Sequence, residues 1–96
     1  MSISDDRMRN LIFECLKGSS KTTPKACRDV AVEIAIREKV IPFVTSANQL
    51  SYSFLPAGFR KQFEECVNYL DKSKQIMFQA KNAPDIYGWW VYLNEP

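Results

Sequence analysis

The chain has 96 residues, of which 46% are hydrophobic and 25% are charged, and its formal net charge is +2. A chain of this size is expected to fold as a single compact domain over residues 1–96 and to bury about two-thirds of its unfolded surface. So small a net charge does not by itself indicate a nucleic-acid-binding protein. No apolar run reaches the roughly 18 residues of a membrane span, and the polar, acidic N-terminus does not resemble a signal peptide.

The residue types exclude several kinds of chemistry. The chain contains no histidine, which removes the commonest general base and the commonest metal ligand. Its cysteines, Cys15, Cys27 and Cys66, form no CxxC pair, and no group of Cys, Asp or Glu has the spacing of a metal site. We therefore expect no enzyme activity, no metal and no cofactor. Because each cysteine falls on the apolar face of a predicted helix, we expect reduced, buried thiols and a cytoplasmic location.

The first predicted helix covers about residues 5–17. Ser4 is a candidate N-cap, Asp5 and Asp6 would lie in the first turn, and Gly18 would end the helix. Apolar residues recur at i, i+3, i+4, i+7 and i+8, which places them on one face. That face consists of Met8, Leu11, Ile12, Cys15 and Leu16.

The second predicted helix covers about residues 24–40, with Thr23 as its N-cap, Pro24 in its first position and Pro42 preventing its continuation. Its apolar arc is so wide that we expect other elements to surround it. Residues 30–36 also alternate as a strand would, but the cap, the alanines and the length favour a helix.

The third predicted helix covers about residues 57–72. Its apolar face consists of Phe59, Phe63, Cys66, Val67 and Leu70. The preceding residues, 43–55, are left open: parts of this segment could form short strands, or its aromatic side chains could fill the core from a loop.

The last quarter of the chain predicts an antiparallel β-hairpin with strands at about 75–81 and 88–93. Both segments alternate with period two, and turn residues 82–85 lie between them. One face is expected to turn inward: Ile76, Phe78, Ala80, Trp89, Val91 and Leu93. The other face, with Met77, Trp90 and Tyr92, would either pack against residues 43–55 or form a patch for a partner.

Three helices followed by a hairpin place the chain in the α+β class, mostly helical. In coarse outline this order resembles a winged-helix domain. The resemblance is architectural, with no family motif behind it, and a fold alone does not establish a function. It implies that the third helix enters the major groove of DNA and that the 81–85 loop is the wing.

A basic turn between the first two helices also favours nucleic acid. Lys17, Lys21, Lys25 and Arg28 occur with no acidic residue between them and with Ser and Thr interleaved. They lead into a predicted helix N-terminus, whose free backbone N–H groups favour phosphate. The turn lacks the second glycine and the preceding strand of a nucleotide-binding loop. The competing interpretation is a solvated, lysine-rich surface turn.

The third helix would supply the base-reading residues of this hypothesis: Arg60, Lys61 and Gln62. Glu64 and Glu65 on the same helix argue against it, because acidic groups near phosphates are repelled. A continuous positive face that joined the basic turn to the start of this helix would favour the hypothesis.

The function predicted from these features is that of a small, DNA-binding or nucleic-acid-binding regulator of transcription. The alternative is a protein-binding adaptor, or an inhibitor of the kind that phages and mobile elements use against host complexes. It would act through the aromatic hairpin residues Met77, Trp90 and Tyr92, since such residues are enriched in interface hot spots. Homodimerisation through the same hairpin is a variant of this alternative.

Overall fold

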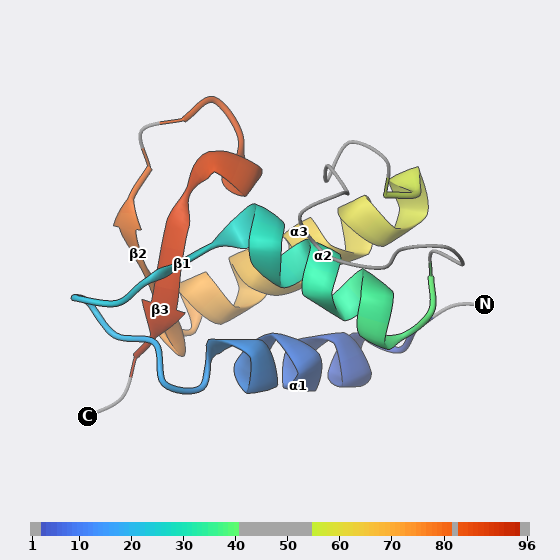
Figure 1. Cartoon of the computed structure of the whole chain (residues 1–96), viewed down its shortest axis with the longest axis horizontal. Helices are drawn as coiled ribbons and strands as arrows, with labels where there is room; N and C mark the ends of the chain where they lie inside the picture. Colours follow the sequence, from blue (N-terminus) through green and yellow to red (C-terminus); the bar gives the residue numbers. More distant parts are fainter. Residues whose placement is uncertain (1–2, 41–54, 82, 95–96) are drawn as a thin grey trace.

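The computed structural model describes residues 3–40, 55–81 and 83–94. In chain order its elements are α1 (Asp5–Leu16), β1 (Lys25–Ala26), α2 (Cys27–Arg37), α3 (Ala57–Lys72), β2 (Ile76–Ala80), the 3-10 helix η3 (Ile86–Gly88) and β3 (Trp90–Leu93). The helices lie along the long axis and the sheet stands at one end of them (Figure 1). The predicted α+β class and its three helices are confirmed. Most of the segment left open by the sequence, residues 43–54, lies outside the described residues.

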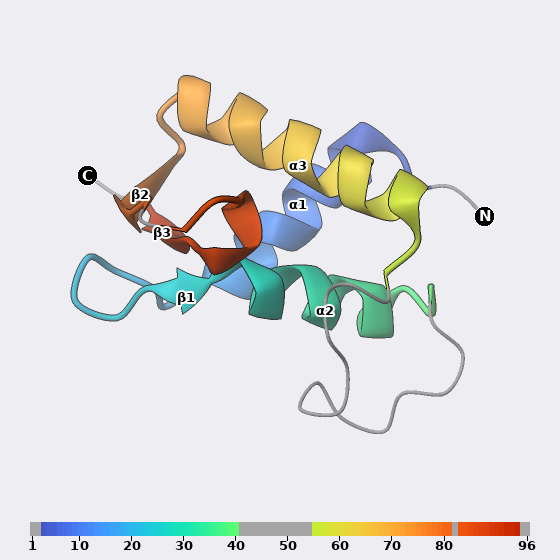
Figure 2. The same ribbon diagram turned by 90° about the horizontal axis from the view of Figure 1, so that it is seen from above.

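The first helix has the predicted start and the predicted buried face. Ser4 Oγ accepts a hydrogen bond from the backbone N–H of Arg7 at 3.1 Å, as an N-cap does. All five apolar residues of its predicted face are buried. This helix packs against both α2 and α3, and Figure 2 shows it between them. It is therefore the helix that α2 and α3 share, and Figure 1 shows it below both.

The second helix starts later than predicted. Lys25 and Ala26 pair with Val91 and Trp90 as an antiparallel strand, so α2 begins at Cys27. Thr23, the predicted N-cap, instead closes a tight turn with Ser20 through backbone hydrogen bonds of 3.2 and 3.0 Å. The local pattern favours a helix start at Pro24, but Lys25 and Ala26 pair with β3 and do not form the first turn of the helix.

Because of this extra strand, the prediction of a two-stranded hairpin is wrong. The sheet has three antiparallel strands in the order β1-β3-β2, so the last strand in the sequence is the central one. Its neighbours in the sheet come from the connection after α1 and from the segment after α3. The sheet therefore pairs the segment that follows α1 with the last strand of the described chain.

The second and third helices end in the same way. Lys39 and Lys74 adopt left-handed backbone conformations, with φ of 56° and 60°. Beyond each of them the next N–H bonds back into the helix at 2.9 Å, from Val40 to the carbonyl of Ala35 and from Gln75 to that of Leu70. This is the Schellman arrangement that usually has glycine at the left-handed position. It ends α2 at Arg37, short of the predicted residue 40.

The two faces of the β2–β3 ribbon are oriented as predicted, with one exception. Ile76 and Val91 are buried, whereas Met77 and Trp90 are exposed. A break in the register between Phe78 and Ala80 places Ala80 opposite Trp90. Paired residues of an antiparallel sheet share a face, so Ala80 lies on the outward side rather than the inward side.

The second part of the connection between β2 and β3, which contains η3, packs onto the core. Ile86 and Tyr87 of η3 are buried. The ring of Tyr87 stacks on Phe63 with centroids 6.0 Å apart, and its hydroxyl donates to the carbonyl of Arg60 at 3.3 Å. This short helix contacts α2, so η3 and α1 together cover the wide apolar arc noted in the sequence.

All three cysteines are buried and unpaired. Burial raises the pKa of Cys15 to about 11 and that of Cys27 to about 12, and it also raises the pKa of Cys66. At neutral pH these thiols are protonated and pack as small apolar side chains. Within residues 3–40, 55–81 and 83–94, no group of three His, Cys, Asp or Glu residues could hold a metal ion. None of the helices described there has both the length and the apolar character needed to cross a membrane.

Candidate functional site

The basic turn begins where α1 ends. Lys17 is the C-cap residue of this helix, and Gly18 follows with a φ of 84°, a conformation that side chains disfavour. Ser19 then fixes the chain in two directions: its hydroxyl donates to the carbonyl of Leu16 and accepts the backbone N–H of Leu93 at 3.0 Å. The turn is therefore attached both to the helix and to the central strand.

A second attachment comes from the far strand of the sheet. The side-chain amide of Gln79 donates to the carbonyl of Lys21 at 2.7 Å. Because Gln79 belongs to β2 and the turn precedes β1, this bond spans the central strand between them. The hydroxyls of Ser20, Thr22 and Thr23 hydrogen-bond to one another at 3.0 and 2.8 Å. The turn is thus ordered by its own contacts, while the Lys21 side chain remains exposed.

The remaining two cations of the basic turn have different surroundings. The Lys25 ammonium group donates to the carbonyl of Cys15 in the last turn of α1. A cation there offsets the negative end of the helix dipole, so Lys25 has a structural role. Arg28 lies in the first turn of α2, where it is exposed.

The candidate residues of the third helix lie elsewhere. Lys61 is exposed, Arg60 is half-buried, and the Gln62 side chain donates to the carbonyl of Ile3 and, at 3.0 Å, to Asp5 Oδ1. The amide of Gln62 is therefore occupied in holding the start of α1. Figures 1 and 2 show the yellow start of α3 and the light-blue turn after α1 toward opposite ends of the molecule. The structure does not join these two groups into one positive face.

The structure does bring other lysines to the basic turn. Leu93 and Asn94, at the end of the central strand, bond to Ser19 on one side and to Gln75 on the other, the latter through an N–H to carbonyl bond of 3.1 Å. The Asn94 side chain also donates to the carbonyl of Lys74 at 2.6 Å. The connection after α1 and the connection after α3 therefore meet at this end of the sheet.

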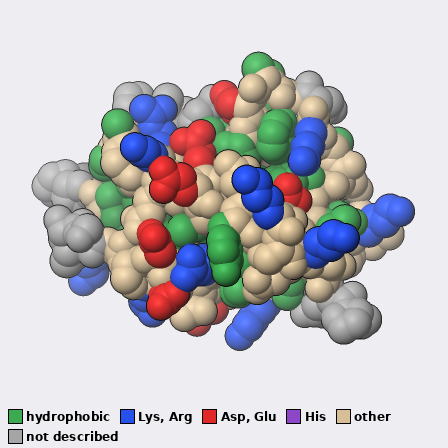
Figure 3. Space-filling view, turned by 180° about the vertical axis from the view of Figure 1, so that it is seen from behind, with side chains coloured by type: hydrophobic (Ala, Val, Ile, Leu, Met, Phe, Trp, Pro, Cys, Tyr) green, Lys and Arg blue, Asp and Glu red, His purple; other side chains and the backbone are tan. Residues whose placement is uncertain are grey.

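We call this region the basic sheet end, and define it by the residues 17–26, 72–81 and 88–94. These three segments contain no acidic residue, but Asp71 and Glu95 directly flank them in the sequence, and Asp71 pairs with Lys81 at 3.6 Å. Their cations are Lys17, Lys21, Lys25, Lys72, Lys74 and Lys81. Figure 3 shows Lys and Arg predominating on the half of the molecule that carries the sheet, whereas acidic and basic side chains alternate on the other half. Sequence reasoning missed Lys72 and Lys74, although the absence of acids from residues 72–81 was a usable signal.

Ion pairing separates the free cations from the engaged ones. In the described part of the chain, the ion pairs are Arg7–Glu38, Arg9–Asp6, Arg37–Glu14, Arg37–Glu33 and Lys81–Asp71. Among the same residues, no acidic partner lies within ion-pair distance of Lys17, Lys21, Lys72, Lys74 or Arg28. At the sheet end, Lys81 is therefore engaged by Asp71, and Lys25 by its bond to α1. The other cations there, Lys17, Lys21, Lys72 and Lys74, are available to an anion.

The predicted partner-binding residues lie on the outward face of the same sheet. Trp90 is 40% exposed and Met77 is 36% exposed, while Tyr92, opposite Met77, is half-buried. Trp89 differs from its neighbour: its indole N–H donates to the carbonyl of Ala83 at 2.8 Å and its ring meets Phe78 edge-on. The aromatic face and the basic turn, which the sequence presented as separate candidates, are joined by the Gln79–Lys21 bond.

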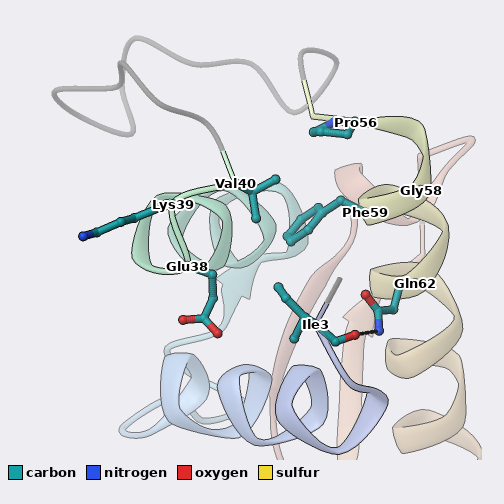
Figure 4. Close-up of a pocket in the computed structure, with 8 residues that line it drawn as sticks. All are labelled: Ile3, Glu38, Lys39, Val40, Pro56, Gly58, Phe59 and Gln62. Atoms are coloured by element: carbon teal, nitrogen blue, oxygen red, sulfur yellow. Dashed lines mark hydrogen bonds between the residues drawn. The ribbon is translucent and has the colours of Figure 1, made fainter. Parts of the chain in front are cut away.

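A cavity of about 490 Å³ lies at the opposite end of the helices, and Figure 4 shows its lining. Phe59 and Val40 extend toward one another across it, with Ile3 below them. The Glu38 carboxylate at its edge accepts two hydrogen bonds from Arg7, at 2.9 and 3.2 Å, which lower the pKa of Glu38 from its usual value. Its described lining is thus mostly apolar, and its one carboxylate is already paired.

Comparison of the chain with protein-family models, with curated proteins and with solved structures found no match. The functional assignment therefore depends on the geometry and charge of this chain alone.

Proposed function

We propose that the protein binds nucleic acid through its basic sheet end. The observation that carries the proposal is the set of lysines that converge there without acidic partners: Lys17, Lys21, Lys72 and Lys74, with Arg28 beside them. Binding to phosphates is driven by such cations, because each contact releases condensed counterions from the nucleic acid. A small net charge is compatible with this mode, since phosphate binding depends on where unpaired cations lie and not on the total charge.

The winged-helix resemblance remains part of this proposal. Three helices precede an antiparallel ribbon, and the connection between β2 and β3 occupies the place of a wing. Two features make the expected nucleic-acid contacts differ from those of a winged-helix domain. The chain is buried directly after the predicted wing, through Ile86 and Tyr87, and the start of α3 lies far from the basic turn. We therefore assign the phosphate contacts to the sheet end and treat Arg60 and Lys61 as a separate group to be tested.

The salt dependence of binding tests this assignment. Affinity for a random 20-base-pair duplex is measured by fluorescence anisotropy between 50 and 200 mM salt, over which several phosphate contacts cost on the order of a thousandfold in affinity. The double variant Lys21→Gln/Lys74→Gln should lower the slope of log K against log salt by about 2, since each contact contributes about 0.9.

The matched control is Lys39→Gln/Lys61→Gln, which removes the same charge from the other end of the molecule. It should leave the slope unchanged. Equal losses in both double variants would refute the assignment of the phosphate contacts to the sheet end. A wild-type protein that binds neither the duplex nor a 20-nucleotide single strand at 50 mM salt would refute nucleic-acid binding altogether.

The second candidate function is that of a protein-binding adaptor or inhibitor that uses the outward sheet face. The exposure of Trp90 and Met77 favours it, because large apolar side chains on a surface are typical of interface hot spots. In its homodimer form it makes a direct prediction: sedimentation should show a dimer that Trp90→Ala converts into a folded monomer. A wild-type monomer at high concentration would exclude the homodimer.

A further inference from the structure

The Ser20–Thr23 turn and the outward face of the sheet form one surface. Gln79 on β2 bonds to the backbone of Lys21 in the turn, across the central strand. Figure 2 shows this turn extending past the sheet on the side away from the helices. Lys21 is exposed next to a sheet face that carries Met77, Trp90 and Tyr92. A ligand on that face would therefore meet aromatic rings and a cation together.

The sheet leaves the indole of Trp90 open. Its cross-strand neighbours are Ala26 on one side and Ala80 on the other. Alanine side chains are too short to cover a neighbouring ring, and Trp90 remains 40% exposed as a result. Tyr92 lies two residues farther along the same strand and on the same face, about 7 Å away at the usual rise of a strand. The face thus carries two aromatic side chains in a row along the central strand, of which Trp90 is exposed and Tyr92 half-buried.

From this arrangement we propose that the outward face of the sheet binds single-stranded nucleic acid, with unpaired bases stacked on Trp90 and Tyr92. The proposal rests on the proposed function and names its preferred substrate. Stacking on exposed aromatic side chains is how many proteins hold unpaired bases, and it tolerates any sequence because every base has a flat face. The bases of a duplex are already stacked on one another and cannot use these rings.

Charge complementarity supports a nucleic acid as the occupant. No acidic residue occurs in β1, β2, β3 or the Ser20–Thr23 turn. Lys21 in the turn and Arg28, two residues after the β1 partner of Trp90, are exposed cations without an ion pair in the described residues. Bases on the rings would bring the phosphates of an extended strand to these cations. Base stacking and phosphate binding are then supplied by adjoining parts of one surface.

The test compares three ligands and two exposed aromatic residues. Binding of labelled 20-nucleotide oligo-dT, 20-nucleotide oligo-rU and a 20-base-pair duplex is measured at 50 mM salt for the wild type, Trp90→Ala and Tyr69→Ala. Tyr69 is the matched control: it is 53% exposed on α3, where Arg9 lies over its ring at 4.8 Å. Trp90→Ala should weaken single-strand binding about tenfold or more, as expected for the loss of one stacked base. It should leave duplex binding unchanged, and Tyr69→Ala should change neither.

A fluorescence measurement makes the test independent of the folding of Trp90→Ala. Stacked bases should quench tryptophan emission of the wild type, and Trp90→Phe should remove most of the quenching while retaining binding. Equal affinity for single strand and duplex, with no quenching, would refute base stacking and leave phosphate binding intact. Absence of binding to all three ligands would instead refute the proposed function itself. A difference between oligo-dT and oligo-rU would identify which kind of strand the face prefers.

Discussion

Replacing Lys74 by glycine should stabilise the protein, although it removes a side chain. Lys74 holds a left-handed φ of 60° at the end of α3, where a residue with a Cβ pays about 1–2 kcal/mol. Glycine avoids that cost but loses about 0.5–1 kcal/mol through its greater freedom in the unfolded chain. The net gain should be about 1 kcal/mol, or about 5 °C in Tm for a domain of this size. The backbone N–H of residue 74, which bonds to the carbonyl of Asp71 at 3.0 Å, is unaffected.

Urea unfolding followed by circular dichroism measures the effect. The matched control is Lys61→Gly, the same chemical change at an exposed position inside α3, which should cost about 1 kcal/mol because glycine disfavours a helix interior. The two variants should therefore shift the urea midpoint in opposite directions. If Lys74→Gly destabilises the protein as much as Lys61→Gly does, the left-handed conformation does not carry the strain assigned to it.

Two further predictions concern a close backbone contact and the buried thiols. Gly88→Ala should destabilise the protein by more than about 1 kcal/mol, the cost of overpacking, because the added Cβ would come within 2.4 Å of Ala83 Cβ. The control is Gly58→Ala in α3, where the added Cβ meets nothing within 4 Å. This variant should be neutral or stabilising in the same urea assay. The free energy of unfolding should fall as the pH rises from 9.0 toward 11. Folding raises the pKa of Cys15 to about 11 and that of Cys27 to about 12. The thiols of the unfolded chain therefore lose their protons first, which favours the unfolded state. Unchanged unfolding free energy between pH 8 and pH 10.5, or the same pH dependence in a Cys15→Ala/Cys27→Ala variant, would contradict this assignment.

Local patterns were sufficient for α1 and α3. The N-cap at Ser4, the buried face of α1 and the apolar face of α3 depend on periodicity and capping over a few neighbouring residues. Such signals depend only on neighbouring positions in the sequence, so they can be recognised without knowing the rest of the fold. For the same reason, the alternation of the ribbon predicted which side of Val91 and Trp90 faces the core.

The sheet needed information that no local window contains. The sequence around Thr23 and Pro24 favours a helix start, and only the presence of β3 makes Lys25 and Ala26 a strand. Likewise, the left-handed lysines at the helix ends carry no glycine signal, because the Schellman hydrogen bonds hold the backbone in place of residue preference.

The candidate site shows the same division. By itself the sequence determined that a basic, acid-free turn and an aromatic ribbon both exist, since these are properties of composition and spacing. Only the tertiary structure decided that they belong together and that Arg60 and Lys61 lie apart from them. The physical reason is that the sheet pairs segments distant in the chain. The central strand takes β1 and β2 as its neighbours, and hydrogen bonds join it and β2 to the basic turn and to the segment after α3 at one end of the molecule.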